Sequence, residues 1–324
     1  MVSQHPIRSP PPRAPEPARP LIVVTTAQAE DDATAPMTAT VLASLAAGEP
    51  LDDDGVRLLD WRAAAEQPPL ELVLPEAGAQ AQCEGRRLVV LAGPADGIPP
   101  ALLESTVRVS RTGVHRLRLS ALAADLGRPR NDLVRELATA APETITRLLR
   151  ARRALLVEGP TDRAVLETVL RRLDDTATEV IPAGSKVRLA ALHGLSSAFG
   201  IAHHVLFDGD GGPVVGGPAR RHRVVRSRRS ATESLLLVLE PSGGAWRFGD
   251  PTLIGGGWSV FAADLEDELA GWPSFLSALS RHGGQLRSKR REQLGRAAAA
   301  AQLADLPSSF RGICDAVAAL DTDS

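Results

Sequence analysis

Several residue types that support particular kinds of chemistry are absent or scarce in this sequence. There is no tyrosine, so no active site can depend on a tyrosine nucleophile. The two cysteines, Cys83 and Cys314, stand alone, which excludes a cysteine-rich zinc module or a disulfide framework and favours the reducing cytoplasm. The only lysines are Lys186 and Lys289. Each lysine is therefore a candidate for a specific role.

Long apolar runs and a large net charge are also absent. The sequence contains no run of about 18 apolar residues, the length needed to span a membrane. Its N-terminus also lacks the apolar segment of a signal peptide. The net charge of −2 means that nucleic-acid binding would have to depend on a local basic patch. No G-x-x-x-x-G-K-S/T phosphate loop occurs, so no ATP site of the usual kind is expected. We therefore expect a cytoplasmic protein without membrane contact.

The chain is long enough for two domains. Residues 1–20 hold seven of the 25 prolines and are expected to form a disordered arm. Residues 21–150 alternate short apolar runs with alanine-rich helical pieces, which predicts an α/β or α+β N-terminal domain. A second α/β domain is expected over residues 151–310, followed by a C-terminal helix and tail over residues 311–324.

The second half alternates strand and helix patterns in a regular order. Apolar runs at residues 154–159, 179–184 and 203–208 predict three strands, and helical spacing of apolar residues predicts two helices between them, over 161–173 and 186–199. Thr161 is the expected N-cap of the first helix. This order predicts a parallel sheet, in which functional groups collect outside the carboxyl ends of the strands.

Acidic residues stand at the ends of two of these strands. Glu158 ends the first strand, and Asp208 and Asp210 end the third at positions i and i+2, where they can point the same way. Convergent carboxylates repel one another and raise each other's pKa unless a cation lies among them. Because Mg²⁺ and Mn²⁺ prefer hard oxygen ligands, the pattern predicts a divalent metal site.

Each acidic motif alone also has a purely structural interpretation. VEGPTD is typical of a strand, a turn and a helix whose N-terminus favours an acid, and DGDGG is typical of a turn. An EF-hand is excluded because Gly212 and Ala219 stand at ligand positions. A dinucleotide-binding loop is excluded because EGPTDR lacks G-x-G-x-x-G. The two motifs together, about 50 residues apart at corresponding strand ends, favour a functional site.

The motifs also form a recognisable set. It consists of E-G-x-S/T-D/E after the first strand, a glycine-lysine turn after the second and D-x-D after the third, in the segments RRALLVEGPTDRAVL, IPAGSK and AFGIAHHVLFDGDGG. This set resembles the Toprim half of the OLD-family (overcoming lysogenization defect) ATP-dependent endonucleases, over roughly residues 150–310. The resemblance implies a Rossmann-like parallel sheet flanked by helices, and an endonuclease that hydrolyses phosphodiester bonds with two Mg²⁺ or Mn²⁺ ions.

The resemblance implies roles for individual residues. Glu158 and Asp162 match the first acidic motif, as catalytic residues, and Gly184 and Lys186 match the glycine-lysine turn. The expected metal ligands are Glu158, Asp208, Asp210 and a later helical acid, for which Glu266 matches best, with Asp264 and Glu268 as alternatives. A later catalytic lysine is also expected, and Lys289 is the only one available.

A run of arginines follows the acids directly. In ARRHRVVRSRRS, residues 219–230, the side chains could hold a phosphate backbone without reading bases, which would make binding sensitive to salt. A solvated loop or a strand with an ionic surface is the alternative. The expected nucleic-acid contacts are Lys186, Arg220, Arg221, Arg226, Arg228 and Arg229.

The sequence leaves two functions open. Full-length OLD proteins resemble an ATPase fused to Toprim, whereas here the phosphate loop is missing, so residues 21–150 are either a degenerate ATPase remnant or unrelated. A complete topoisomerase is excluded by the absence of tyrosine, and a primase by the lack of a zinc module. What remains is a nuclease acting on DNA, with RNA as an alternative. The second function is a non-catalytic nucleic-acid-binding or regulatory partner of a separate ATPase or helicase in DNA repair or phage defence. A homodimer is consistent with either.

Overall fold

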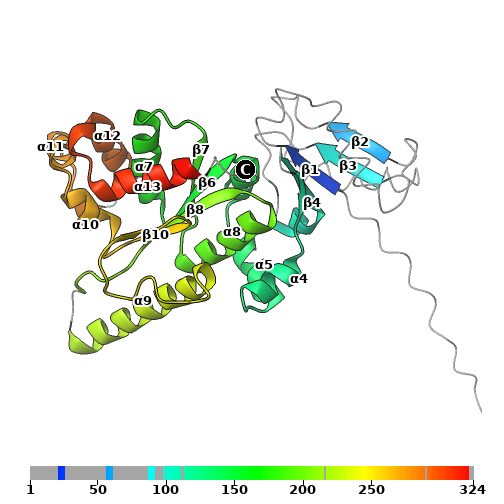
Figure 1. The fold of residues 1–324 in the computed structure, drawn as a ribbon, viewed down its shortest axis with the longest axis horizontal. Coiled ribbons are helices and arrows are strands. Elements are labelled where there is room, and N and C mark those ends of the chain that lie inside the picture. Colours follow the sequence, from blue (N-terminus) through cyan, green and yellow to red (C-terminus); the bar gives the residue numbers. More distant parts are fainter. Residues whose placement is uncertain are drawn as a thin grey trace, which may run out of the picture.

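The computed structural model describes residues 21–25, 56–60, 87–91, 98, 100–110, 113–214, 217–288 and 290–320. In these residues the chain forms two five-stranded sheets, one from strands within residues 21–116 and one from strands within residues 153–261 (Figure 1). The predicted disordered arm, residues 1–20, lies outside the described residues.

The C-terminal sheet has the strand order β7-β6-β8-β10-β9. Its strands are β6 (Arg153–Val157), β7 (Thr178–Pro182), β8 (Ala202–Asp208), β9 (Leu253–Ile254) and β10 (Trp258–Phe261). All neighbouring strands run parallel except β9, which is antiparallel to β10. The predicted α/β fold with a mostly parallel sheet is confirmed.

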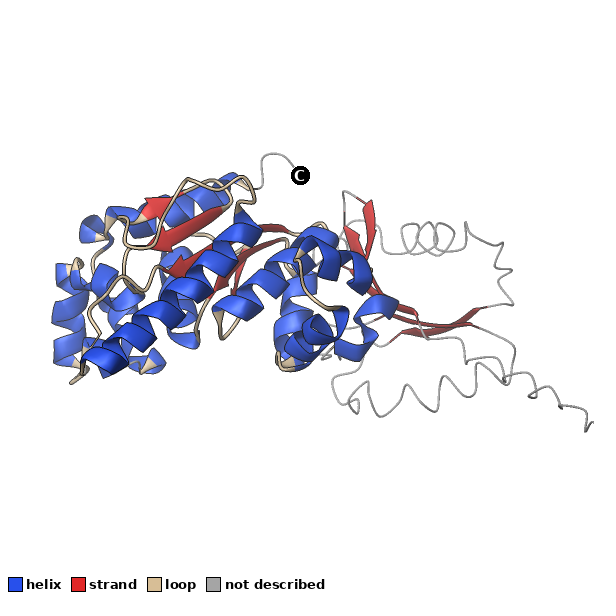
Figure 2. Cartoon of the chain, turned by 90° about the horizontal axis from the view of Figure 1, so that it is seen from below, coloured by secondary structure: helices blue, strands red, loops and turns tan. Residues whose placement is uncertain are grey.

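Helices cover both faces of this sheet, as Figure 2 shows. Alternate residues of the central strand β6 enter different cores: Leu155 and Val157 pack on one face, Ala154 and Leu156 on the other. The first face is covered by α7 (Pro160–Arg172), α11 (Pro273–Arg281), α12 (Arg291–Ala300) and α13 (Ser308–Ala319). The second is covered by α8 (Lys186–Ala198) and by the C-terminal half of α9 (Pro218–Leu239). Burial on both faces explains the unbroken apolar run of β6.

Local signals set where α7 and α8 begin. Helix α7 starts at Pro160 with Gly159 as its N-cap, because the Asp162 carboxylate accepts a hydrogen bond from the Gly159 N–H at 2.7 Å. The prediction of Thr161 as the N-cap is therefore wrong. Helix α8 starts behind Ser185, whose hydroxyl oxygen accepts from the backbone N–H of Arg188 at 3.2 Å.

The N-terminal sheet has the order β2-β3-β1-β4-β5, with only the β4–β5 pair antiparallel. Its strands are β1 (Leu21–Thr25), β2 (Val56–Asp60), β3 (Arg87–Leu91), β4 (Thr106–Ser110) and β5 (Gly113–Arg116). The short helix η2 (Pro100–Ser105) precedes β4, and three helices then lead into β6: α4 (Leu119–Asp125), α5 (Arg130–Ala138) and α6 (Pro142–Arg150).

A buried arginine joins the two parts of the chain. Arg108 on β4 is 2% exposed. Its guanidinium donates to the carbonyls of Leu149 and Ala151 at the end of α6, and of Phe199 and Gly200 at the end of α8, over 2.9 to 3.1 Å. The surrounding hydrophobic core also runs without interruption across residue 150. The division of the chain at that residue stays a prediction.

Candidate metal and nucleic-acid site

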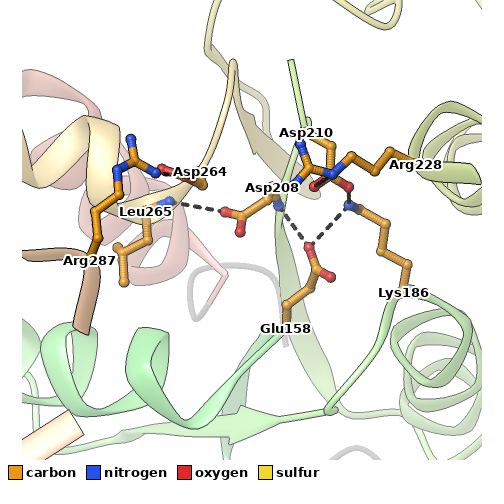
Figure 3. A network of polar contacts seen from close by, with 8 residues as sticks. All are labelled: Glu158, Lys186, Asp208, Asp210, Arg228, Asp264, Leu265 and Arg287. Carbon is orange, nitrogen blue, oxygen red and sulfur yellow. Dashed lines mark hydrogen bonds and ion pairs between the residues drawn. The ribbon is translucent and has the colours of Figure 1, made fainter. Parts of the chain in front are cut away.

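Two acids lie at neighbouring strand ends, as the sequence pattern predicts. Strands β6 and β8 are adjacent and parallel; Glu158 directly follows β6 and Asp208 is the last residue of β8. The backbone N–H of Asp208 donates to Glu158 Oε2 at 3.1 Å (Figure 3). The pairing of the two strands therefore holds these acids together.

Asp208 carries the strongest electrostatic perturbation among these acids. Its Oδ1 accepts a hydrogen bond from the N–H of Leu265, the first residue of α10 (Leu265–Ala270), at 3.1 Å. Burial raises its pKa well above the ordinary value, and the nearby charges of Asp162 and Glu158 raise it further. A carboxylate in this position favours either a proton or a neighbouring cation.

Glu158 has a similar but smaller shift. Burial is again the main cause that raises its pKa, and the charge of Asp210 adds to it. The ammonium of Lys186 and the hydrogen bond from the Asp208 N–H act in the opposite direction. The site is thus short of positive charge even with one lysine present.

Asp210 lies in a tightly packed loop whose shape depends on glycine. The N–H groups of Gly209, Asp210 and Gly211 donate to the carbonyls of Phe261, Ala263 and Ala262, at 2.7, 2.9 and 3.1 Å. A Cβ atom on Gly209 would lie 2.5 Å from the Phe261 oxygen. Asp210 itself has a φ of 61°, in the left-handed region. The alternation of aspartate and glycine therefore allows the loop to approach the backbone that links β10 to α10.

Lys186 lies inside the acidic cluster. It is the first residue of α8 and is 6% exposed. Its Nζ lies 3.3 Å from Glu158 Oε2 and forms an ion pair with Asp210 Oδ2. Gly184, with a φ of 87°, makes the turn from β7 into α8 that brings the lysine here. The predicted contact of Lys186 with nucleic acid stays a prediction.

Comparison with known proteins agrees with this arrangement. Residues 149–210 match the family described as "Overcoming lysogenization defect protein-like, TOPRIM domain". The chain contains a Toprim domain that resembles the one in the C-terminal half of OLD proteins. This confirms the resemblance predicted from the sequence. The matched segment includes Glu158, Lys186, Asp208 and Asp210.

Solved structures of OLD C-terminal regions are also similar. The region from Burkholderia pseudomallei is 21% identical and the alignment covers 52% of this chain and 98% of that one, with a TM-score of 0.34. The region from Xanthomonas campestris pv. campestris is 15% identical, covering 52% and 96%, also with a TM-score of 0.34. No protein with curated information matches the sequence of this chain.

The arginine run follows the matched segment and forms the N-terminal part of α9. From Pro218 to Thr232 the helix has no acidic residue. Arg229 pairs with Glu233 at 2.7 Å, one turn later. Exposed side chains in this segment include Arg220, Arg221, Arg226 and Arg229. The segment is therefore a basic helical surface beside the acids.

One arginine of this run reaches the acidic cluster, which the sequence-based reasoning did not anticipate. Arg228 Nε lies 3.5 Å from Asp210 Oδ1, and its side chain is 37% exposed. A signal was present in the sequence, because Arg228 shares a helical face with Thr232 and Leu235, and both of these are buried. The packing of α9 against the core directs that face toward Asp210.

The acids of α10 differ in their surroundings. Asp264 caps the helix by accepting from the Asp267 N–H at 2.9 Å, pairs with Arg287 Nη1 at 2.8 Å, and adds to the raised pKa of Asp208. Glu266 is 2% exposed. Glu268 accepts hydrogen bonds from the hydroxyls of Thr252 and Ser309. Figure 3 shows Asp264 between Arg287 and Asp208. Lys289 lies outside the described residues.

The chemistry of the acidic cluster fits a hard divalent cation. Its donors are carboxylate oxygens, which suit Mg²⁺ and Mn²⁺, and burial leaves Glu158 and Asp208 in need of positive charge. Within the described part of the chain, no three histidine, cysteine, aspartate or glutamate side chains are arranged to hold a metal ion. Two cationic side chains, Lys186 and Arg228, contact Asp210 instead.

Among the described residues, no helix combines the length and apolar character of a membrane span.

Proposed function

We propose that the chain is a metal-dependent nuclease of the Toprim type, which cuts or nicks DNA by phosphodiester hydrolysis. The observation that supports this most strongly is the gathering of Glu158, Asp208 and Asp210 around the ends of β6 and β8. In a purely structural site, buried carboxylates that raise each other's pKa would destabilise the folded state. In a cation-binding site, the same carboxylates would serve as ligands.

In this proposal the acids act as oxygen ligands for Mg²⁺ or Mn²⁺, with Glu266 as a further ligand. Two bound cations would activate a water molecule and stabilise the leaving 3′ oxygen. Lys186 orients Glu158 and Asp210 through its ion pairs with both. Asp162 accepts a hydrogen bond from the Gly159 N–H and so fixes the start of α7, directly after Glu158 in the chain. Lys289 is proposed to offset charge on the reacting phosphate.

The basic surface of α9 is proposed to hold the nucleic-acid backbone. Among these exposed arginines, only Arg229 has an acidic partner in the described contacts, which is Glu233. Most of their positive charge therefore faces solvent. Such a surface binds phosphates without reading bases. Because the sequence has no phosphate loop, any ATP-driven step would need a separate ATPase or helicase.

A supercoiled plasmid assay tests the proposal. The purified full chain is incubated with plasmid, single-stranded DNA or RNA in Mg²⁺, in Mn²⁺ or in EDTA. We expect nicked or linear plasmid with at least one of the metals and intact plasmid in EDTA. Cleavage of RNA alone would correct the substrate and leave the reaction type standing.

A non-catalytic nucleic-acid-binding partner is the second candidate. One observation favours it: Lys186 and Arg228 already contact Asp210, and the described residues contain no three-ligand metal group. Such a protein would bind nucleic acid through α9 and regulate a separate ATPase or helicase in DNA repair or phage defence. Binding that depends on the arginines, with no cleavage in either metal, would favour this function over the nuclease.

A further inference from the structure

Asp210 has two cationic partners that differ in their access to solvent. Lys186 is 6% exposed and also contacts Glu158, whereas the Arg228 side chain is 37% exposed and reaches only Asp210 among the ion pairs found in the described residues. Partly exposed ion pairs are weak and screened by salt. A phosphate group from solvent could therefore replace Asp210 as the partner of Arg228, but not of Lys186.

The course of α9 brings a nucleic-acid backbone to this arginine. Thr232 and Leu235, on the same face as Arg228, are buried in the domain, while the first turns of the helix extend away from it (Figure 1). Arg221 lies seven residues before Arg228 on that face and is exposed. At 1.5 Å per residue the two are about 10 Å apart along the helix. A backbone that follows this face meets Arg221 first and then Arg228, beside Asp210.

We infer that Arg228 is a positioning residue that couples nucleic-acid binding to cation binding. Without nucleic acid, Arg228 holds Asp210 Oδ1. When a backbone phosphate binds the guanidinium, that oxygen becomes available to a divalent cation. This inference rests on the proposed function, because it takes Asp210 as a cation ligand. The change needs only a new side-chain rotamer, since the helix stays anchored through Thr232 and Leu235.

Thermodynamic linkage makes the coupling measurable without cleavage. If a polyanion increases the affinity for Mn²⁺, then Mn²⁺ increases the affinity for the polyanion by the same factor. Free Mn²⁺ is measured by electron paramagnetic resonance in titrations of the full chain, with and without a phosphorothioate oligonucleotide that resists hydrolysis. An oligonucleotide with an uncharged methylphosphonate backbone is the control for charge.

We expect the charged oligonucleotide to tighten Mn²⁺ binding by wild type about five-fold or more, and the uncharged one to have no effect. Arg228→Gln should bind Mn²⁺ more tightly than wild type without any oligonucleotide, and should lose the coupling. Arg228→Lys, which keeps the charge, should restore part of it. Arg135→Gln removes the same charge from a side chain of α5 that is 78% exposed and pairs with Asp132, and should retain the coupling.

The outcomes separate this inference from the proposed function. Wild-type Mn²⁺ binding that charged oligonucleotide does not change would overturn the role of Arg228 and leave the nuclease proposal standing. Equal effects of Arg228→Gln and Arg135→Gln would do the same, because a general charge effect would then explain the result. Absence of Mn²⁺ binding with and without oligonucleotide would overturn both.

Discussion

The backbone N–H of Asp208 donates a hydrogen bond to the Glu158 carboxylate over 3.1 Å, between the ends of two adjacent parallel strands. Strand pairing therefore holds the two acids close together. Burial raises the pKa of both side chains. The fold thus carries an electrostatic cost at neutral pH, which a proton or a cation would relieve.

In EDTA, these two groups should make the chain less stable as the pH rises from about 4 toward neutrality. Their pKa is higher in the folded than in the unfolded state, so the folded state binds protons more tightly. This stabilisation is complete below the unfolded pKa and is lost as the pH rises through the folded pKa. Urea denaturation over this pH range gives the free energy of unfolding.

Asp208→Asn isolates one of these groups. At neutral pH in EDTA we expect the variant to be more stable than wild type by about 1 kcal/mol or more, and the difference should disappear below about pH 4. Added Mn²⁺ should stabilise wild type more than the variant. A variant that is less stable than wild type in EDTA at neutral pH would contradict this account of Asp208.

Arg108 should be important for stability although it contacts the chain just before β6 and β8, at the opposite ends of these strands from the acids. Burial lowers its pKa to about 10, and its four hydrogen bonds to backbone carbonyls satisfy the planar guanidinium. Lysine keeps the charge but lacks this geometry, so Arg108→Lys should lower the free energy of unfolding by about 2–4 kcal/mol. Arg135→Lys, on a side chain that is 78% exposed, should change it by less than about 0.5 kcal/mol. Similar losses in both variants would argue against this role.

Gly209→Ala should disturb the loop that holds Asp210. The new Cβ would meet the Phe261 oxygen at 2.5 Å, and we expect a loss of about 1–3 kcal/mol in stability together with weaker Mn²⁺ binding. Gly217→Ala is the matched control, because nothing lies within 4 Å of its Cβ position and its φ is −66°. Thermal unfolding and Mn²⁺ titration measure both effects. Unchanged Mn²⁺ affinity in Gly209→Ala would show that the shape of this loop does not contribute to metal binding.

The exposed arginines of α9 should determine how DNA binding depends on salt. Replacing Arg220, Arg221 and Arg226 by glutamine removes three charges and leaves Arg228 in place. For duplex DNA, the slope of log affinity against log salt should become shallower by about 0.9 for each phosphate that the protein no longer neutralises. Fluorescence anisotropy at several salt concentrations measures this slope. An unchanged slope would show that the backbone binds elsewhere.

The central acids could be predicted because their positions follow from local patterns. Apolar runs ended by Glu158 and by Asp208 predict strands, and the alternation with helices predicts that the two ends meet at one edge of a parallel sheet. The contacts of Arg228 could not be predicted from such local patterns. They depend on how α9 packs against the core, and this is set by residues distant in the sequence.

The acids of α10 show a second reason for incomplete prediction. Asp264, Glu266 and Glu268 lie within five residues of one another, so spacing alone could not rank them. Their different roles come from tertiary partners: Arg287 for Asp264, and Thr252 and Ser309 for Glu268. The choice among them as a metal ligand stays a prediction.

Cleavage and binding measured together on Asp208→Asn test the central claim most directly. The substitution removes one negative charge and keeps the shape of the side chain, and the arginines of α9 are unchanged. With Mg²⁺ or Mn²⁺, plasmid nicking should fall by about two orders of magnitude or more, while DNA affinity in EDTA should fall by no more than about two-fold. Glu292→Gln, on a side chain of α12 that is 76% exposed, should nick like wild type. Nicking by Asp208→Asn at the wild-type rate would contradict the account.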